Sequence, residues 1–449
     1  MKKLLLVSAN QYTVPYPVYP LGLAYIKTYL ESKLDNFEIR LFDFVGKNEN
    51  DFIQYLQEYR PEYVGVSFRN IDDVNIYKKE SFIFHYRKII ENIRKYSHSK
   101  IVVGGPGFSI YPKFLFEFVK PDFGIYGEGE ESFHHLLMAL ENNTDYTIIE
   151  GLVFPTEKGT QVNPRTTFFN NLDLSFDNEL TDFYWKESGM LNIQTKRGCP
   201  YKCIYCTYPV IEGRKIRTLD TDKIVDTLKN LYFNKKIDYV FFTDSVFNMC
   251  NDYNHELADK IINSGIDIKW GGYFNFALLD EKLLVKLKKA GLTHIEFGTE
   301  SISDTTLKNY NKPFTVAEII EASALCNRLD IDFAHFLILG GYGETDETIN
   351  ETFENSKKIN RSVFFPFVGM RIYPGTRLHQ IAIDENKIDL SDDLLEPKFY
   401  ISNKINLDTL KERAKASGRR WIFPDEDMSA IMDKMRKKNK KGPLWEYLI

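Results

Sequence analysis

Short apolar runs alternate with amphipathic segments along the first third of the chain. Residues 3–8 form an apolar run that predicts a buried strand, and residues 20–30 carry apolar side chains at helical spacing. The same pattern predicts further strands at 37–42, 63–68, 101–107 and 123–126, and helices at about 50–59, at 78–96 and after Glu130. Such alternation is typical of a parallel sheet with helices on both faces. We therefore predict an α/β domain over residues 1–145.

The pattern changes between residues 146 and 190. Two short apolar runs in residues 151–162 surround Lys158 and Gly159, which predicts a small hairpin. Pro164 and the Asn-Asn-Leu-Asp stretch at 170–173 are typical of a linker. We place the boundary between the first domain and the rest of the chain in this segment.

Strands and helices alternate again from residue 191. The expected strands lie at 191–195, 239–243, 268–274, 294–299, 334–339 and 364–370. Parallel strands with helical crossovers predict a partial (β/α)6 barrel of the TIM type over residues 191–385, whose active site is formed by loops at the carboxyl ends of the strands. Residues 386–449 are expected to form a small, mainly helical domain, with Trp421, Trp445 and Tyr447 either packed within it or lining a substrate pocket.

Composition narrows the classes of protein. The chain has 449 residues and a formal net charge of −5, from 58 basic and 63 acidic side chains. Its one basic run, at 434–441, is typical of a solvated helix end, so we expect no nucleic-acid partner. No apolar stretch is long enough for a membrane span or a signal peptide. The five cysteines do not suggest a disulfide framework, and reduced thiols favour the cytoplasm.

Three of the five cysteines stand on one short segment. Cys199, Cys203 and Cys206 have the spacing C-x3-C-x2-C. Three thiolates this close can hold an iron–sulfur cluster and leave one iron without a protein ligand. The alternatives are a structural zinc site, which needs a fourth ligand that this loop does not supply, and cysteines that pack as small apolar side chains.

Residues 195–206 resemble the cluster loop of the radical S-adenosylmethionine (SAM) superfamily. The resemblance implies a [4Fe–4S] cluster on Cys199, Cys203 and Cys206, whose open iron chelates SAM and whose electron cleaves it to a 5′-deoxyadenosyl radical. It implies contacts to SAM from residues at the ends of the barrel strands and in the cluster loop: Tyr205, Asp244, Glu300, Ser301, Gly340 and Gly341. The usual Gly-Gly-Glu of the family is absent, so the contact to the SAM amino group falls to the backbone near Thr243 and Asp244. Glu300 has the alternative of capping the next helix.

Residues 1–385 resemble the subgroup of this superfamily in which a flavodoxin-like (Rossmann-like) cobalamin-binding domain precedes the barrel. The resemblance implies cobalamin contacts at the strand ends of the first sheet, from Ser67, Arg69, Asn70, Gly104, Gly105, Gly127, Glu128, Gly129 and Glu130. No G-x-G-x-x-G follows the first strand, which disfavours a dinucleotide site. A fold of this kind that has lost its cobalamin is the remaining alternative.

The loop after the first strand contains no histidine. Cobalamin domains that ligate cobalt through histidine carry Asp-x-His-x-x-Gly there, so the resemblance implies cobalamin without a histidine ligand. We expect Arg69 to lie near the cobalt without ligating it, because a guanidinium has no lone pair to give. The alternative is an ion pair between Arg69 and Asp72 or Asp73.

The two cofactors together imply methyl transfer. A methyl group would pass from methylcobalamin to an unactivated carbon of a small molecule, peptide or lipid precursor, and a second SAM would remethylate the cobalt. Radical cyclisation or rearrangement, methylation of phosphorus, polar methylation of carbon, and a cobalamin-binding sensor without turnover are the alternatives. An electron donor such as flavodoxin or ferredoxin is implied, and we expect a monomer.

Overall fold

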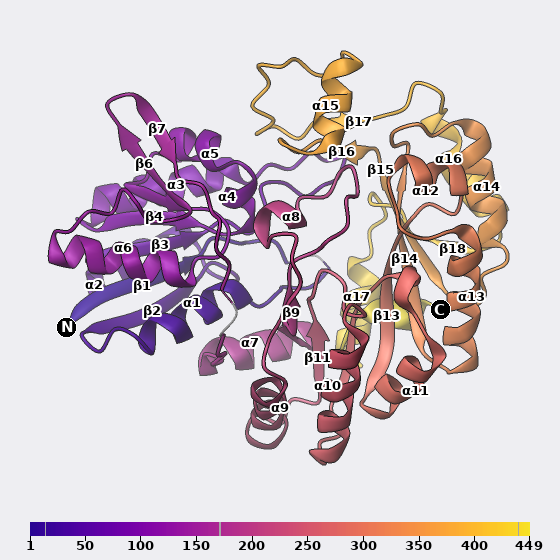
Figure 1. Cartoon of the computed structure of the whole chain (residues 1–449), viewed down its shortest axis with the longest axis horizontal. Helices are drawn as coiled ribbons and strands as arrows, with labels where there is room; N and C mark the ends of the chain where they lie inside the picture. The colour runs from indigo at the N-terminus through magenta and orange to yellow at the C-terminus, as the bar shows by residue number, and fades with distance from the viewer. Residues whose placement is uncertain (14, 170–171, 439) are drawn as a thin grey trace.

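Two α/β units lie side by side in the computed structural model, which describes residues 1–13, 15–169, 172–438 and 440–449 (Figure 1). Residue 14 of the loop after the first strand, residues 170 and 171 of the expected linker and residue 439 of the basic run lie outside the described residues. The first unit is indigo to magenta in Figure 1, and the second is largely red to orange.

The first unit is built on a seven-stranded sheet with the order β2-β1-β3-β4-β5-β6-β7. Its strands are β1 Lys2–Ser8, β2 Phe37–Asp43, β3 Tyr63–Ser67, β4 Lys100–Gly104, β5 Phe123–Ile125, β6 Leu152–Thr156 and β7 Gly159–Val162. The first five run parallel in the order 2-1-3-4-5, which confirms the flavodoxin-like prediction. The hairpin expected in the linker forms and pairs with β5, so it extends the first sheet.

Helices flank the first sheet and join its strands. They are α1 Leu21–Glu31, α2 Glu49–Tyr59, α3 Ile83–Tyr96, α4 Pro106–Ile110, α5 Pro112–Val119 and α6 Glu130–Asn142. A reciprocal capping box between Asn48 and Asp51 starts α2. The helix expected from residue 78 starts only at Ile83, because the Asp73 amide donates to the carbonyl of Glu80 (3.1 Å) and closes a loop first.

The second unit contains a seven-stranded parallel sheet with the order β18-β15-β14-β13-β12-β11-β8. The strands are β8 Leu191–Ile193, β11 Tyr239–Phe242, β12 Lys269–Phe274, β13 Leu292–Glu300, β14 Asp332–Leu339, β15 Val363–Val368 and β18 Arg420–Trp421. The first six confirm the predicted partial barrel. The short β18 comes from the segment expected to be mainly helical, and it pairs with β15 at the edge of the barrel.

Helices and short hairpins complete the second unit. The helices are α7 Asn178–Ser188, α8 Tyr208–Ile211, α9 Thr221–Lys229, α10 Asn251–Asn263, α11 Glu281–Lys289, α12 Asp304–Asn309, α13 Val316–Arg328, α14 Asp346–Ser356, α15 Arg377–Asp384, α16 Leu410–Ala416 and α17 Ser429–Lys437. The paired strands are β9 Lys196–Arg197 with β10 Arg217–Thr218, and β16 Met370–Arg371 with β17 Phe399–Tyr400. Short helices occur at η1 Asn230–Asn234, η2 Phe276–Leu278, η3 Leu407–Thr409 and η4 Leu444–Leu448.

The two units share one apolar core and a buried ion pair. Ile204, between two of the clustered cysteines, belongs to the same buried group as Phe68 and Phe108 of the first unit. The guanidinium of Arg371 on β16 donates to Asp72 in the loop after β3 (2.9 Å), and both side chains are buried. These contacts fix the carboxyl ends of the two sheets against each other.

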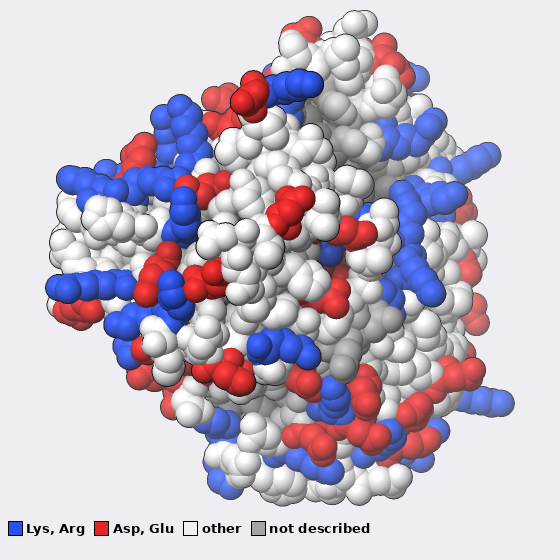
Figure 2. Space-filling view, turned by 60° about the vertical axis from the view of Figure 1, so that its left-hand side comes forward, with Lys and Arg blue, Asp and Glu red and all other residues white. Residues whose placement is uncertain are grey.

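The surface shows charges of both signs. On the face in Figure 2, acidic and basic side chains are interspersed around a broad uncharged area. Within the basic run, Lys441 pairs with Asp238 (3.2 Å) and lies over the ring of Trp185. In the part of the chain that the structure describes, no helix is both long and apolar enough to cross a membrane.

Loss of Arg371 should destabilise the joined units strongly. Arg371→Leu leaves the buried Asp72 carboxylate without its cation, and breaking a buried pair in this way costs about 3–5 kcal/mol. The matched control is Arg361→Leu, which removes exposed pairs with Asp330 and Asp332 at a cost of under about 1 kcal/mol. Urea unfolding of both variants measures the difference, and equal losses of stability would contradict the ion pair as a junction.

Candidate active site between the two sheets

A cavity of about 520 Å³ lies where the carboxyl ends of the two sheets meet. From the first unit it is lined by the ends of β1, β3, β4 and β5, which is where ligands bind in open α/β sheets. From the barrel it is lined by Asn192, Gln194, Arg197, Thr243 and Tyr273. The structure brings together in its wall all the residues predicted for cobalamin: Ser67, Arg69, Asn70, Gly104, Gly105, Gly127, Glu128, Gly129 and Glu130.

Packing within the protein also requires glycines at the end of β4. Gly105 has a φ of +95°, and a Cβ there would come within 2.7 Å of the Phe68 carbonyl and the Ser67 hydroxyl. A side chain at this position would therefore push the end of β3 away. The expectation that Gly104 and Gly105 leave space for a corrin is compatible with their place in the cavity wall, but their close packing against β3 and β5 explains their size independently.

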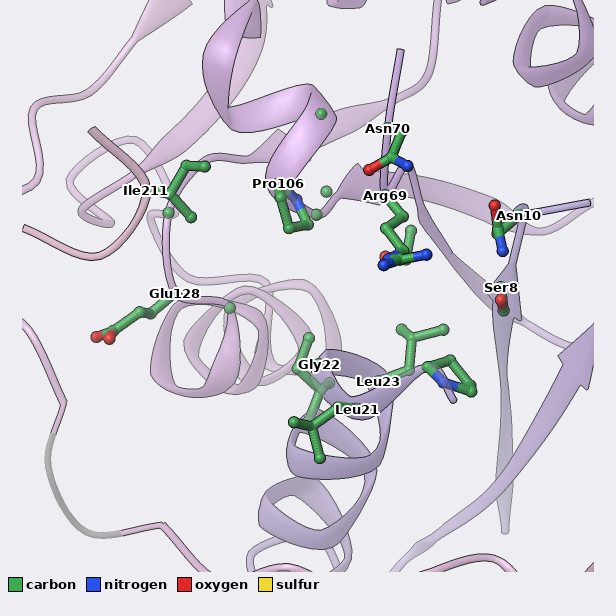
Figure 3. A pocket seen from close by; sticks show the side chains of 18 of the residues that line it. Ser8, Asn10, Leu21, Gly22, Leu23, Arg69, Asn70, Pro106, Glu128 and Ile211 are labelled. Carbon is green, nitrogen blue, oxygen red and sulfur yellow. The ribbon is translucent and has the colours of Figure 1, made fainter. Parts of the chain in front are cut away.

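Arg69 points into the cavity (Figure 3). The alternative that it pairs with Asp72 or Asp73 is not what the structure shows. Asp72 is taken by Arg371, and Asp73 accepts from the amides of Asn75 and Glu80. Among the described residues the Arg69 guanidinium has no hydrogen-bond or ion-pair partner, so its charge is available to a ligand in the cavity.

The carboxylates of Glu128 and Glu130 are committed to arginines. Arg197 on β9 lies 3.3 Å from Glu128 and 2.9 Å from Glu130, and Arg217 on β10 lies 2.6 Å from Glu128, with all four side chains buried. In Figure 3 the Glu128 side chain is directed away from the other labelled residues. These ion pairs hold the barrel against the first sheet. The predicted contact of Glu128 and Glu130 with cobalamin stays a prediction. One oxygen of Glu130 remains buried without a partner among the described residues.

The cysteine loop is fixed at its start by backbone contacts. Gly198 has a φ of +91°, and a Cβ there would lie only 2.2 Å from the Lys215 carbonyl, so only glycine fits. The Gly198 amide donates to the buried Glu212 (3.1 Å), and the Cys199 amide donates to the Gly213 carbonyl (3.1 Å). The loop therefore presents Cys199 from a rigid support.

The three thiols lie close enough to influence one another. Burial raises the pKa of all three. For Cys206, burial together with the charges of Cys203 and Cys199 raises the pKa to about 12. Iron binding would have to supply the charge that holds them as thiolates. In the described part of the chain no three His, Cys, Asp or Glu side chains converge on a single metal ion. A [4Fe–4S] cluster does not require such convergence, since each thiolate binds a different iron.

Asp244 and Ser301 support the site from within the protein. The Asp244 carboxylate accepts from the Thr195 amide (2.6 Å), the Thr195 hydroxyl, and the amide and ammonium group of Lys196. The Ser301 hydroxyl is buried against Thr352 (3.0 Å) and accepts from the Ser303 amide. Both side chains are thus bonded within the protein. The predicted SAM contacts, from the backbone near Thr243 and Asp244 and from Ser301, stay predictions. Asp244 anchors the strand that leads into the cysteine loop, and Thr243 beside it lines the cavity.

Glu300 joins the barrel to the cysteine loop. It ends β13 at a register shift, with a φ of +60° that is uncommon outside glycine. Its Oε1 accepts from the Tyr205 hydroxyl (2.7 Å) and lies 3.2 Å from the ammonium group of Lys312. Tyr205 and Glu300 are thus bonded to each other, and Ser303 rather than Glu300 stands at the start of α12. The predicted contact of both residues with SAM stays a prediction. Burial alone would lower the pKa of Lys312, but the charges of Glu300 and Cys203 raise it above its usual value.

The glycine loop after β14 is closed by its own chain. The amides of Gly340 and Gly341 both donate to the buried Glu344 (2.6 and 3.0 Å), and a Cβ on Gly341 would meet the Tyr310 hydroxyl at 2.1 Å. The amides of Gly340 and Gly341 are therefore already paired within the protein. The predicted contact of this loop with SAM stays a prediction.

Several functional candidates were missed in the sequence. Lys312 is buried beside the cysteines, and Tyr208 and Tyr273 line the cavity. Tyr273 stands near the carboxyl end of β12, and Tyr208 comes two residues after the last clustered cysteine, so position along the chain was the available signal for both. Nothing local marked Lys312, which reaches the site from the far end of α12.

Replacement of single cysteines should show which thiols bind the cluster and which two do not. Cys203→Ala should lose most of the iron and sulfide that the wild-type protein takes up under anaerobic reconstitution. The matched controls are Cys250→Ala and Cys326→Ala, which lie outside the C-x3-C-x2-C segment and should retain both. Iron and sulfide analysis measures the outcome, and equal iron content in Cys203→Ala and Cys326→Ala would refute the assignment.

Lys312 should tune the electron affinity of the site. Lys312→Met removes a buried positive charge next to the cysteines, so a bound cluster should become harder to reduce and its potential should fall. Lys308→Met, an exposed change on the preceding helix α12, is the control and should have little effect. A redox titration followed by electron paramagnetic resonance measures both, and an unchanged or raised potential in Lys312→Met would count against this arrangement.

Comparison with known proteins gives a consistent assignment. Residues 193–355 match the family model of the radical SAM superfamily, and residues 8–137 match that of the B12 binding domain. The uncharacterized methyltransferase PH0819 of Pyrococcus horikoshii is 25% identical over 403 residues, which cover 86% of this chain and 85% of the relative. Tryptophan 2-C-methyltransferase of Streptomyces laurentii is 24% identical over 439 residues, 82% of this chain and 72% of the relative.

A solved structure shows the same fold over the whole length. The radical SAM methyltransferase TsrM from Kitasatospora setae, with cobalamin and a [4Fe–4S] cluster bound, superposes with a TM-score of 0.86 at 22% identity and covers 100% of this chain and 97% of its own. The B12-binding model matches the first unit of the fold and the radical SAM model matches the second. Residues of both units line the cavity. The chain therefore belongs to the cobalamin-dependent radical SAM family, with a B12-binding domain ahead of a radical SAM domain.

Proposed function

We propose that this protein is a methyltransferase that uses cobalamin, a [4Fe–4S] cluster and SAM to methylate a carbon atom of a small molecule. The observation that carries the proposal is the single cavity onto which both units open. Its first wall contains the predicted cobalamin residues, and its barrel wall leads from Gln194, Arg197 and Thr243 to the cysteine loop. Reactants held on the two walls of one cavity meet in a defined geometry.

The residues present fit both groups. Three adjacent thiols and a buried lysine suit an anionic cluster, and an unpaired arginine with a polar strand edge suits a corrin. When bound, the cluster supplies the electron that cleaves SAM, and cobalamin supplies the methyl group. The chain's own residues position them: Glu300 and Tyr205 hold the cysteine loop against β13, and Arg197 holds it against the first sheet.

Methyl transfer is favoured over the other outcomes by the relatives. Both curated relatives described above are named methyltransferases, as is the superposed structure. The alternative reactions are cyclisation, rearrangement, methylation of phosphorus and polar methylation of carbon. They would use the same two cavity walls, and they differ in the acceptor and in whether 5′-deoxyadenosine forms. We further propose that the protein acts as a monomer in the cytoplasm and takes its electron from a flavodoxin or ferredoxin.

Product analysis tests the proposal. The anaerobically reconstituted protein, loaded with hydroxocobalamin and supplied with reductant and SAM labelled on its methyl group, should methylate the cobalamin and release S-adenosylhomocysteine. With an acceptor present, 5′-deoxyadenosine should form as well if the transfer is radical. Cys203→Ala should lose 5′-deoxyadenosine, whereas Cys326→Ala should not. Failure to bind cobalamin would contradict the proposal. Release of neither product by protein that holds both cofactors would contradict it and favour a sensor.

A further inference from the structure

A buried carboxylate that the proposed methyl transfer leaves unused lies in the barrel wall below the cavity. Glu296 on β13 is 5% exposed. It is paired in register with Tyr273 on β12 and with Ala334 on β14. Side chains at paired positions of neighbouring strands point to the same face of a sheet, and Tyr273 lines the cavity. Glu296 therefore lies next to the cavity lining, one strand further round the barrel, with only a methyl group on its other side.

The carboxylate of Glu296 has no cation. Its Oε1 accepts from the indole Nε1 of Trp445 (2.9 Å), and within the described residues it makes no other hydrogen bond and no ion pair. Four other carboxylates around the site have a cation: Glu128 and Glu130 pair with Arg197, Asp244 with Lys196, and Glu300 with Lys312. Glu212 has no ion pair among the described residues, but both of its oxygens accept hydrogen bonds, from the Gly198 amide and from the Gln194 side chain. Burial accordingly raises the pKa of Glu296 to about 7.

The neighbouring histidine does not supply the missing charge. His294 lies two positions earlier on β13, is fully buried, and meets the Tyr239 hydroxyl through Nε2 (2.6 Å). Burial lowers the pKa of His294 to about 3, so the ring is neutral. A buried charge without a partner is costly, and a ligand that brings a cation would remove that cost.

Aromatic side chains surround the carboxylate. The rings of Tyr273 and Phe241 meet edge to face at 5.0 Å, and the ring of Trp445 lies against that of His294. Tyr273 is paired in register with Glu296, and Tyr16 packs against the buried cluster that contains Tyr239 and Phe241. Burial, followed by the charge of Glu296, raises the pKa of both phenols above the usual range. Aromatic faces around a carboxylate form a favourable environment for an organic ammonium group.

The C-terminal segment holds this arrangement in place. Trp445 belongs to η4, which packs against β14 and β15. Gly442 passes the ring of Tyr239 so closely that a Cβ would lie 3.2 Å from it. Trp445 thereby fixes one oxygen of Glu296 from below. Trp445 is therefore packed within the protein, which is one of the two roles expected from the sequence. The other, in a substrate pocket, stays a prediction.

We propose that Glu296 selects the methyl acceptor by binding a protonated amine of that molecule. The acceptor is then a small molecule with an ammonium group next to an apolar or aromatic body. In this arrangement Tyr16 and Tyr273 surround the ammonium group, and Trp445 is a positioning residue that acts through Glu296. The inference rests on the proposed function for the identity of the ligand as acceptor, but the binding it describes needs neither cluster reduction nor methyl transfer.

Ligand-observed NMR with matched probes tests the proposal on the reconstituted holoenzyme. The probes are phenethylamine and tryptamine, compared with 2-phenylethanol and tryptophol, which replace the ammonium group with a hydroxyl. The wild-type protein should bind each amine roughly tenfold to a hundredfold more tightly than its alcohol, as expected for a charge-assisted contact. Glu296→Gln, which keeps the shape and can still accept from Trp445, should bind both members of each pair equally.

Two further variants make the result specific. Glu446→Gln removes the neighbouring carboxylate that faces His294 (3.8 Å), and it should keep the preference for amines. Trp445→Phe keeps the Glu296 charge but loses the bond that positions it, and it should reduce the preference. Thermal unfolding of every variant establishes that it is folded.

The outcomes separate this inference from the proposed function. Equal binding of amine and alcohol to the wild-type protein, no detectable amine binding, or a preference that survives in Glu296→Gln would each overturn the role of Glu296. Retention of the amine preference by a protein that releases neither S-adenosylhomocysteine nor 5′-deoxyadenosine would support the binding site and contradict the methyltransferase.

Discussion

Arg197 stands two residues before the first clustered cysteine and is buried between Glu128 and Glu130 of the other unit. Burial alone would lower its pKa, but these two charges raise it well above the usual value. These three charged groups can be buried only together, because a buried charge is tolerated only when it is paired. The pairing therefore requires the first sheet and the cysteine loop to dock in one register. The position of any cluster relative to any corrin follows from that register.

Other buried contacts also fix the first sheet against the second unit. The Tyr184 hydroxyl on α7 donates to Asp43 at the end of β2 (2.6 Å), and Arg371 pairs with Asp72 beneath the loop that carries Arg69. Each contact joins the carboxyl end of a strand in the first sheet to the second unit. The cavity is the space left between these contacts, and its walls are two sets of strand ends. The charged groups that fix the junction are paired with one another. Among the described residues, Arg69 and Glu296 have no ion-pair partner, so both are available to ligands.

The fold was largely predictable from the sequence because its signals are local. Apolar runs such as residues 3–8 and 239–243 are long enough to mark buried parallel strands, and the cysteine spacing marks the loop. The residues predicted for cobalamin also gathered in one wall, since carboxyl ends of parallel strands meet at one edge. Side-chain partners were less predictable. Asp244, Ser301, Glu128 and Glu130 turned inward to protein groups, and Lys312 and Glu296 gained importance only from neighbours distant in sequence.

The central claim is that one cavity brings a cobalt centre and an iron–sulfur cluster to facing walls. The most direct measurement is pulsed electron paramagnetic resonance on protein that contains both cob(II)alamin and the reduced cluster, since both centres are then paramagnetic. The account predicts a dipolar interaction between the two signals, retained in Cys326→Ala and absent in Cys203→Ala. Two non-interacting signals from doubly loaded wild-type protein would contradict it.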